Sequence, residues 1–89
     1  MRAIVTVIGR DHVGIIAAVC QLLASFEINI LDISQTVMQE LFTMNMLVDM
    51  SACTAAYDAV SAALTAKGEE MGLSIRIQRE DIFQAMHRV

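Results

Sequence analysis

Apolar and polar residues alternate along four segments of the chain, and this alternation predicts four β-strands. Residues 2–9 are apolar on both faces, which is typical of a strand that lies inside a sheet. Residues 29–38 and 41–49 are separated only by a tight turn at Glu40, so they predict an antiparallel hairpin. Residues 73–79 complete the set.

The alternation also predicts which side chains of the hairpin face the core. In residues 29–38, Leu31, Ile33 and Val37 fall on one face and polar residues on the other. In residues 41–49 the apolar face is more regular. It holds Phe42, Met44, Met46 and Val48. We therefore expect a sheet with one apolar face under helices and one mostly polar, open face.

Two longer segments have apolar residues at helical spacing. Residues 13–26 are apolar nearly all round, and such a helix is usually buried on more than one side. We expect one side to lie on the sheet and another to meet a partner. Residues 54–71 predict a second helix, with Thr54 as its N-cap and Gly72 where it ends. Residues 80–88 predict a short C-terminal helix.

The predicted order is strand, helix, strand, strand, helix, strand, followed by the terminal helix. Right-handed crossover connections place both longer helices on one face of a four-stranded antiparallel sheet. This is the ferredoxin-like arrangement of the α+β class. The length of 89 residues predicts one domain, spanning residues 1–89.

The composition changes this picture by adding a second subunit. Hydrophobic residues make up 56% of the chain. A chain of this size buries only about 60–65% of the surface that its unfolded form exposes. A monomer therefore cannot hide this much apolar surface, and we expect a homodimer.

The charge and the cysteines narrow the classes of function. Ten acidic and six basic residues give a net charge of −4, which argues against nucleic acid and anionic membranes as partners. No apolar run is long enough to span a bilayer, and the N-terminus lacks the pattern of a signal peptide, so the expected location is the cytoplasm. Cys20 and Cys53 fit no metal or redox motif. We expect neither a metal nor a cofactor.

The segment Ile8-Gly9-Arg10-Asp11-His12-Val13-Gly14-Ile15 is the strongest candidate for a binding site. It leaves a central strand and enters a helix, whose first amides lack helical partners and carry the positive end of the helix dipole. These amides suit a carboxylate, and Gly14 allows close approach of a ligand. Asp11 either caps the helix or accepts a hydrogen bond from an amino group of the ligand.

Other residues near this segment add weaker candidates. Asn29 opens the second strand and can both donate and accept hydrogen bonds. His12 is either a solvated loop residue or a partner for an anionic ligand, or binds a metal with Asp11. Arg10 and Asn29 also permit an alternative function, a small hydrolase of the acylphosphatase type. The segment lacks the glycine-rich cradle that a phosphate substrate favours.

The run from Ile8 to Ile15, followed by Asn29-Ile30, resembles the ACT domain family. The chain is also similar to a family of free-standing, one-domain ACT proteins of prokaryotes. This similarity lies in the run from Asn29 to Val37, the triplet Phe42-Thr43-Met44 and the end of the chain from Ile82 to Arg88. The similarity to the ACT repeats of the glycine-cleavage regulator is more distant. The resemblance covers essentially the whole chain.

The resemblance implies a non-catalytic regulatory module that binds an amino acid or related metabolite between two subunits and signals to a protein that the sequence does not identify. It implies that Asp11 and Asn29 hold the ligand, with backbone amides near Gly14. Val13 departs from the family, in which proline is common at this position, and Asp11 stands where Asn is frequent, so the ligand stays open. The expected ligand-binding residues are Arg10, Asp11, His12, Gly14, Ile15, Asn29 and Ile30.

Overall fold

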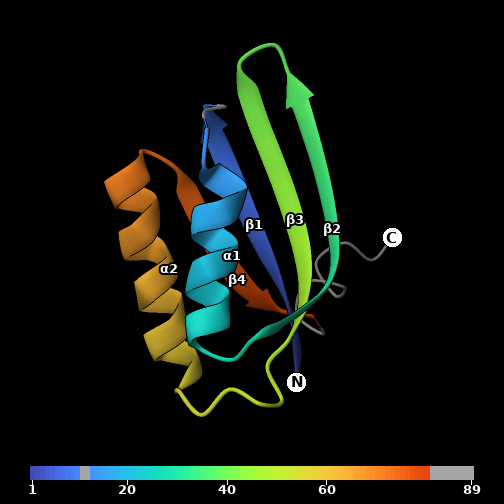
Figure 1. The fold of residues 1–89 in the computed structure, drawn as a ribbon, viewed down its shortest axis with the longest axis vertical. Coiled ribbons are helices and arrows are strands. Elements are labelled where there is room, and N and C mark those ends of the chain that lie inside the picture. Colours follow the sequence, from blue (N-terminus) through green and yellow to red (C-terminus); the bar gives the residue numbers. More distant parts are fainter. Residues whose placement is uncertain (11–12, 81–89) are drawn as a thin grey trace.

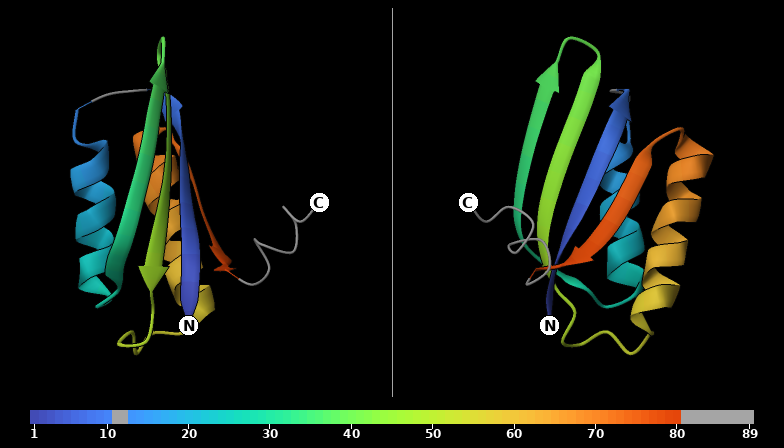
Figure 2. Two further views of the ribbon diagram at one scale, coloured as in Figure 1. Left: turned by 90° about the vertical axis from the view of Figure 1, so that its right-hand side faces the viewer. Right: turned by 180° about the vertical axis from the view of Figure 1, so that it is seen from behind.

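The computed structural model describes residues 1–10 and 13–80, which form an antiparallel sheet with two helices on one face (Figures 1 and 2). The strand order is β2-β3-β1-β4, and each neighbouring pair is antiparallel. The predicted ferredoxin-like fold is therefore confirmed. The elements are β1 (Arg2–Arg10), α1 (Ile15–Ser25), β2 (Asn29–Met38), β3 (Leu41–Asp49), α2 (Tyr57–Met71) and β4 (Ser74–Arg79).

The core lies between the sheet and the two helices. The inner strands β1 and β3 contribute alternate residues to it, because successive side chains of a strand point to opposite faces. Each large apolar side chain buried here stabilises the fold by about 1.5–3 kcal/mol. The fully buried residues include Val5, Val7, Met44, Met46, Val48, Val19, Leu23, Val60 and Leu64.

The second helix begins later than the sequence predicts. The N-cap of α2 is Ala56, without a side-chain hydrogen bond, and not Thr54. The backbone of Ala56 is still extended, and its carbonyl accepts the N–H groups of Ala59 and Val60. The helix thus starts at Tyr57, which packs against the core, and this packing overrides the capping preference of Thr54.

Other boundaries differ by one or two residues. β1 continues to Arg10, and α1 covers only residues 15–25. β4 starts at Ser74, because the N–H of Leu73 donates to Gly68 O at the end of α2. The predicted helix over residues 80–88 lies outside the described residues from residue 81 onward.

Strand β2 departs most from its predicted pattern. The pairing with β3 shifts between Ile30 and Asp32, so Leu31 is the extra residue of a bulge and leaves the alternation. Ile33 and Val37 do face the helix side, since they pair with core residues of β3, yet they are 41% and 52% exposed. All residues of β2 except Ile30 are exposed. Neither helix covers this edge of the sheet, as Figure 1 shows.

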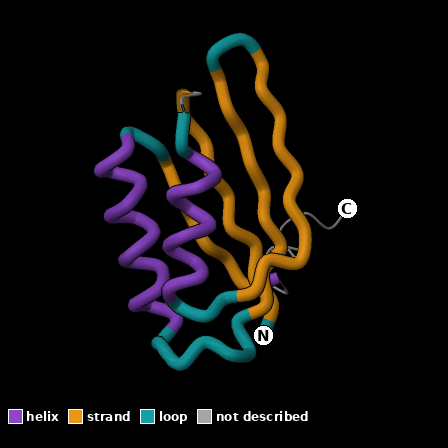
Figure 3. Tube along the Cα trace, viewed as in Figure 1, coloured by secondary structure: helices purple, strands orange, loops and turns teal. Residues whose placement is uncertain are grey.

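The turn between β2 and β3 extends past the ends of the other strands (Figure 3). Among the described residues, neither helix has the length and apolarity that crossing a membrane requires.

Both helices end in the same hydrogen-bonded turn but with different residues in the left-handed position. In α2 this residue is the predicted Gly72 (φ 72°), and the next N–H, from Leu73, donates to Gly68 O at 2.7 Å. In α1 the residue is Glu27 (φ 59°), and Ile28 N–H donates to the helix in the same way. A side chain in this conformation costs about 1–2 kcal/mol.

We therefore expect Glu27→Gly to raise the free energy of unfolding by about 0.5–1 kcal/mol, because relief of the backbone strain exceeds the added freedom of the unfolded chain. The reverse change at the matching position, Gly72→Ala, should lower it by about 1 kcal/mol. Urea unfolding of both variants measures this. A loss of stability in Glu27→Gly would show that its backbone is not strained.

Candidate functional site

The connection from β1 to α1 ends in a helix start that no described side chain caps. Gly14 is the N-cap of α1, with φ 93° in the region that favours glycine. No described side chain caps the helix, and its first internal bond runs from Ala18 N–H to Gly14 O at 2.9 Å. The N–H groups of Ile15 and the two residues that follow therefore have no helical acceptor. They form the positive end of the helix dipole and can bind an anion.

Space next to this helix start is open. A Cβ atom added at Gly14 would meet no atom of the described residues within 4 Å, so glycine serves the backbone conformation here and not a tight fit. Ile15 is 2% exposed and packs in the core, so only its backbone can contact a ligand. The predicted ligand residues Asp11 and His12 lie outside the described residues.

Arg10, at the end of β1, extends from the sheet toward the turn of the hairpin. Its Nη2 lies 3.3 Å from Glu40 Oε2, and both side chains are more than four-fifths exposed. Such a surface pair contributes little to stability. Arg10 is thus available to exchange Glu40 for an anionic ligand.

The structure does not bring the remaining predicted residues to this end of the sheet. Asn29 pairs with Asp49 of β3, which in turn pairs with Arg2 at the beginning of β1. The helix start follows the other end of β1, so Asn29 and Gly14 are separated by the length of a nine-residue strand, roughly 25 Å. Within one chain these residues cannot contact the same small ligand. Ile30 is partly buried and packs against the core.

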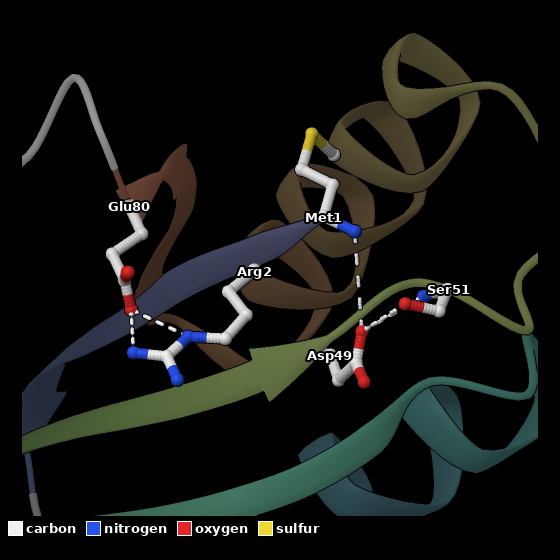
Figure 4. Close-up of polar contacts among 5 residues, drawn as sticks. All are labelled: Met1, Arg2, Asp49, Ser51 and Glu80. Atoms are coloured by element: carbon white, nitrogen blue, oxygen red, sulfur yellow. Dashed lines mark hydrogen bonds and ion pairs between the residues drawn. The ribbon is translucent and has the colours of Figure 1, made fainter.

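A polar cluster that the sequence analysis missed is centred on Asp49, the partner of Asn29 in the register. Ser51 donates to Asp49 Oδ1 from both its N–H (3.0 Å) and its Oγ (2.6 Å), and the Met1 ammonium lies 4.0 Å from the same oxygen. Beside them, Arg2 donates to Glu80 through Nε and Nη2 (Figure 4). The pattern Asp-x-Ser after a predicted strand is the signal that could have revealed this turn.

These contacts keep Asp49 ionised. The hydrogen bonds from Ser51 lower the pKa of the Asp49 carboxyl below its usual 3.8. Slight burial raises this pKa, whereas the Met1 ammonium and the Arg2 guanidinium lower it further. A fixed negative charge therefore lies next to Asn29, at the opposite end of the sheet from the positive end of α1.

The described residues offer no cluster of three His, Cys, Asp or Glu side chains that could hold a metal ion. Both cysteines are free thiols and partly buried.

Exposed apolar side chains concentrate around β2. Of the nine large exposed hydrophobic residues among those described, β2 carries four, β3 begins with a fifth, and two more lie at or just before the start of α1. We call this surface the β2 edge. It consists of Val13, Ile16, Leu31, Ile33, Val37, Met38 and Leu41.

Sequence comparison finds matches over nearly the whole chain. A family model described as ACT domain matches residues 2–78. A UPF0237 protein of Clostridium acetobutylicum is 57% identical over 89 residues, and the match covers all of both chains. A UPF0237 protein of Methanopyrus kandleri is 48% identical over 88 residues, covering 99% of this chain and 98% of that protein.

Solved structures share the fold. The ACT domain protein from Streptococcus pneumoniae has a TM-score of 0.82 at 39% identity, with 94% of each chain covered. A putative glycine cleavage system transcriptional repressor has a TM-score of 0.73 at 22% identity, with 86% of this chain and 44% of the repressor covered. At that identity the likeness concerns the fold alone.

The lowered pKa of Asp49 predicts an acid-dependent stability. A carboxyl with a lower pKa in the folded state stabilises the fold above its unfolded pKa, and this contribution disappears as the pH falls through the folded pKa. We expect the wild type to lose stability more steeply than Asp49→Asn as the pH falls from about 5 to 2. An NMR titration of the Asp49 carboxyl should give a pKa that rises in Ser51→Ala. An unchanged pKa would show that the Ser51 hydroxyl does not lower it.

Proposed function

Because the chain belongs to the ACT domain family, we propose that it is a non-catalytic regulatory module that binds an amino acid or related small metabolite as a homodimer. One observation carries this proposal. The two parts of the predicted site, the start of α1 and Asn29, lie at opposite ends of the same sheet, beside an edge that no described element covers.

The β2 edge has the properties of a pairing surface. An edge strand presents a row of unpaired backbone groups, and proteins usually protect such strands with Lys, Pro or several charges. Strand β2 has ten residues, no Lys, Arg or Pro, and only Asp32 as a charge. On the helix side it exposes the apolar side chains of Ile33 and Val37. A second copy is the occupant that explains both the free edge and the apolar surface.

Antiparallel pairing of two β2 strands would complete the site. A twofold axis near the middle of β2 turns one copy end over end. It thereby carries Asn29 of the partner subunit toward the end of the sheet where α1 begins. The dimer would then hold two equivalent sites, each with a helix start from one copy and Asn29 from the other.

The charges on the two sides suit a zwitterion. The amides at the start of α1 favour a carboxylate. Asn29 can accept a hydrogen bond from an ammonium group, and the ionised Asp49 beside it favours that positive charge. An α-amino acid carries both groups a short distance apart.

The alternative, an acylphosphatase-type hydrolase that uses Arg10 and Asn29, finds less support. These residues lie at opposite ends of the sheet, so one chain cannot direct both to a single acyl phosphate.

We expect Ile33→Lys to convert the dimer to a monomer. In antiparallel pairing the introduced ammonium groups of the two copies lie close together near the centre of the contact, where like charges repel. The dimer dissociation constant should rise at least about thirtyfold, as measured by analytical ultracentrifugation.

Ile8→Lys is the matched control. Ile8 is 42% exposed, like Ile33 at 41%, but lies on the inner strand β1. This variant should remain a dimer. A wild-type chain that is monomeric at about 100 μM, or equal dissociation of both variants, would exclude the β2 edge as the interface.

A site shared between subunits predicts complementation. Asp11→Ala and Asn29→Ala should each abolish the thermal shift that an amino-acid hit causes in the wild type. After subunit exchange, half of the dimers are mixed, and each mixed dimer regains one intact site. Calorimetry should then find about a quarter of the wild-type sites.

The control for this experiment is a mixture of Asp11→Ala with the double variant Asp11→Ala/Asn29→Ala, which contains no intact site. No recovery in the first mixture, with exchange verified by mass spectrometry, would mean that the site lies within one chain.

A further inference from the structure

No described element covers the face of the sheet opposite the two helices (Figure 2). Residues that pair across neighbouring strands point to the same face, so the side chains of this open face form rows that cross the sheet from β4 to β2. One row has two large aliphatic residues side by side at its centre, and we call it the aliphatic row. It consists of Gln78, Ile4, Leu47 and Asp32.

Ile4 and Leu47 are aliphatic side chains without a place in the core. Both are partly exposed, and within the described part of the chain neither belongs to the core cluster nor packs against it. The next row along the strands is polar, with Thr6 donating to Asn45 Oδ1 at 3.0 Å. An apolar group that covered the aliphatic row would remove this pair from water, which is favourable.

The chain leaves β4 on the same face, next to the aliphatic row. Glu80 accepts hydrogen bonds from Arg2 Nε at 2.8 Å and from Arg2 Nη2 (Figure 4). Arg2 precedes Ile4 by two residues on β1, so the two side chains point to the same face. The ion pair therefore holds the exit of the chain roughly 7 Å along the strand from the aliphatic row.

The nine residues that follow Glu80 supply an apolar surface of matching length. Ile82, Phe83 and Met86 fall on one side of the predicted C-terminal helix. A helix over residues 80–88 is about 13.5 Å long, and the three strand spacings from β4 to β2 amount to about 14 Å. Such a helix therefore spans the aliphatic row from one end to the other.

The charges at the two ends of this segment favour one orientation. Glu80 and Asp81 precede the apolar residues and Arg88 follows them, an order that suits the dipole of a helix. With Glu80 held by Arg2 beside β4, a helix along the row brings Arg88 above β2. Asp32, at that end of the row, is the only charged residue of β2 and has the opposite sign.

We propose that residues 81–89 bind to the open face of their own sheet as an amphipathic helix that covers the aliphatic row. Phe83 lies over Ile4 and Leu47, and the helix crosses the strands from β4 to β2. This contact is independent of the ligand site and of the β2 edge, since it uses neither the helix face of the sheet nor the backbone of β2.

A second copy of the chain is a less suitable occupant of the open face. A facing sheet would also bury the polar row that contains Thr6, Asn45 and the charged Arg76, and burial of polar groups without new partners is costly. A single helix is only about 10 Å wide, so it covers the aliphatic row and leaves most of the polar rows in water.

Methyl NMR of the full chain tests the contact directly. Phe83 would be the only aromatic side chain on the open face, because Phe42 is in the core and Phe26 and Tyr57 pack against the core. The Leu47 methyl signals should therefore shift upfield through the ring current, and Phe83→Leu should abolish this shift. Nuclear Overhauser contacts should join the Phe83 ring to the same methyl groups.

A double-mutant cycle measures the contact by urea unfolding. Phe83→Ala and Leu47→Ala should each lower the urea midpoint, with a coupling of about fivefold in the unfolding equilibrium constant, because the second change removes no further contact. Ile8→Ala is the matched control. Ile8 is on the same face of β1 but about 14 Å beyond Ile4, so its effect should add to that of Phe83→Ala.

Three results would overturn the proposal. The first is a Leu47 spectrum without a ring-current shift or contacts to Phe83. The second is additivity of Phe83→Ala with Leu47→Ala, or equal coupling with Ile8→Ala. The third is that, in a mixture of isotope-labelled and unlabelled chains, the contacts join only different copies, which would place the segment on the partner subunit.

Discussion

An open sheet leaves a row of unpaired backbone groups along each edge, and the rest of this structure depends on how the two edges are treated. The inner strands β1 and β3 satisfy their backbone on both sides and carry seven of the seventeen buried core residues among those described. Strand β2 is long, exposed and nearly uncharged, while β4 is short, carries arginines and lies beside α2. Chains that leave β2 unpaired would expose both apolar side chains and polar backbone, so association lowers both costs at once.

This constraint also explains why one chain cannot direct both parts of the proposed ligand site to one small molecule. The strand order places the end of β1 and the beginning of β2 at opposite ends of the sheet. The start of α1 and the ionised Asp49 are each incomplete as recognition elements, since a small zwitterion needs both charges within a few ångströms. The proposed twofold axis along β2 shortens that separation. Assembly and ligand binding then depend on the same strand, and each favours the other.

Local patterns predicted the elements well, because alternation and helical spacing follow directly from burial. The hairpin strands 29–38 and 41–49 have their predicted bounds. The errors have physical causes. The bulge at Leu31 removes one residue from the alternation, and Thr54 loses its capping role to the position at which α2 reaches the core. The site was harder, because the link between Asp49 and Asn29 depends on strand register, and register is a long-range property.

In the proposed dimer the β2 strands meet at the centre of one continuous sheet, so ligand binding and assembly of that sheet are linked equilibria. A metabolite that binds only the complete site would stabilise the dimer. The coupling would operate through assembly and would need no rearrangement of the fold.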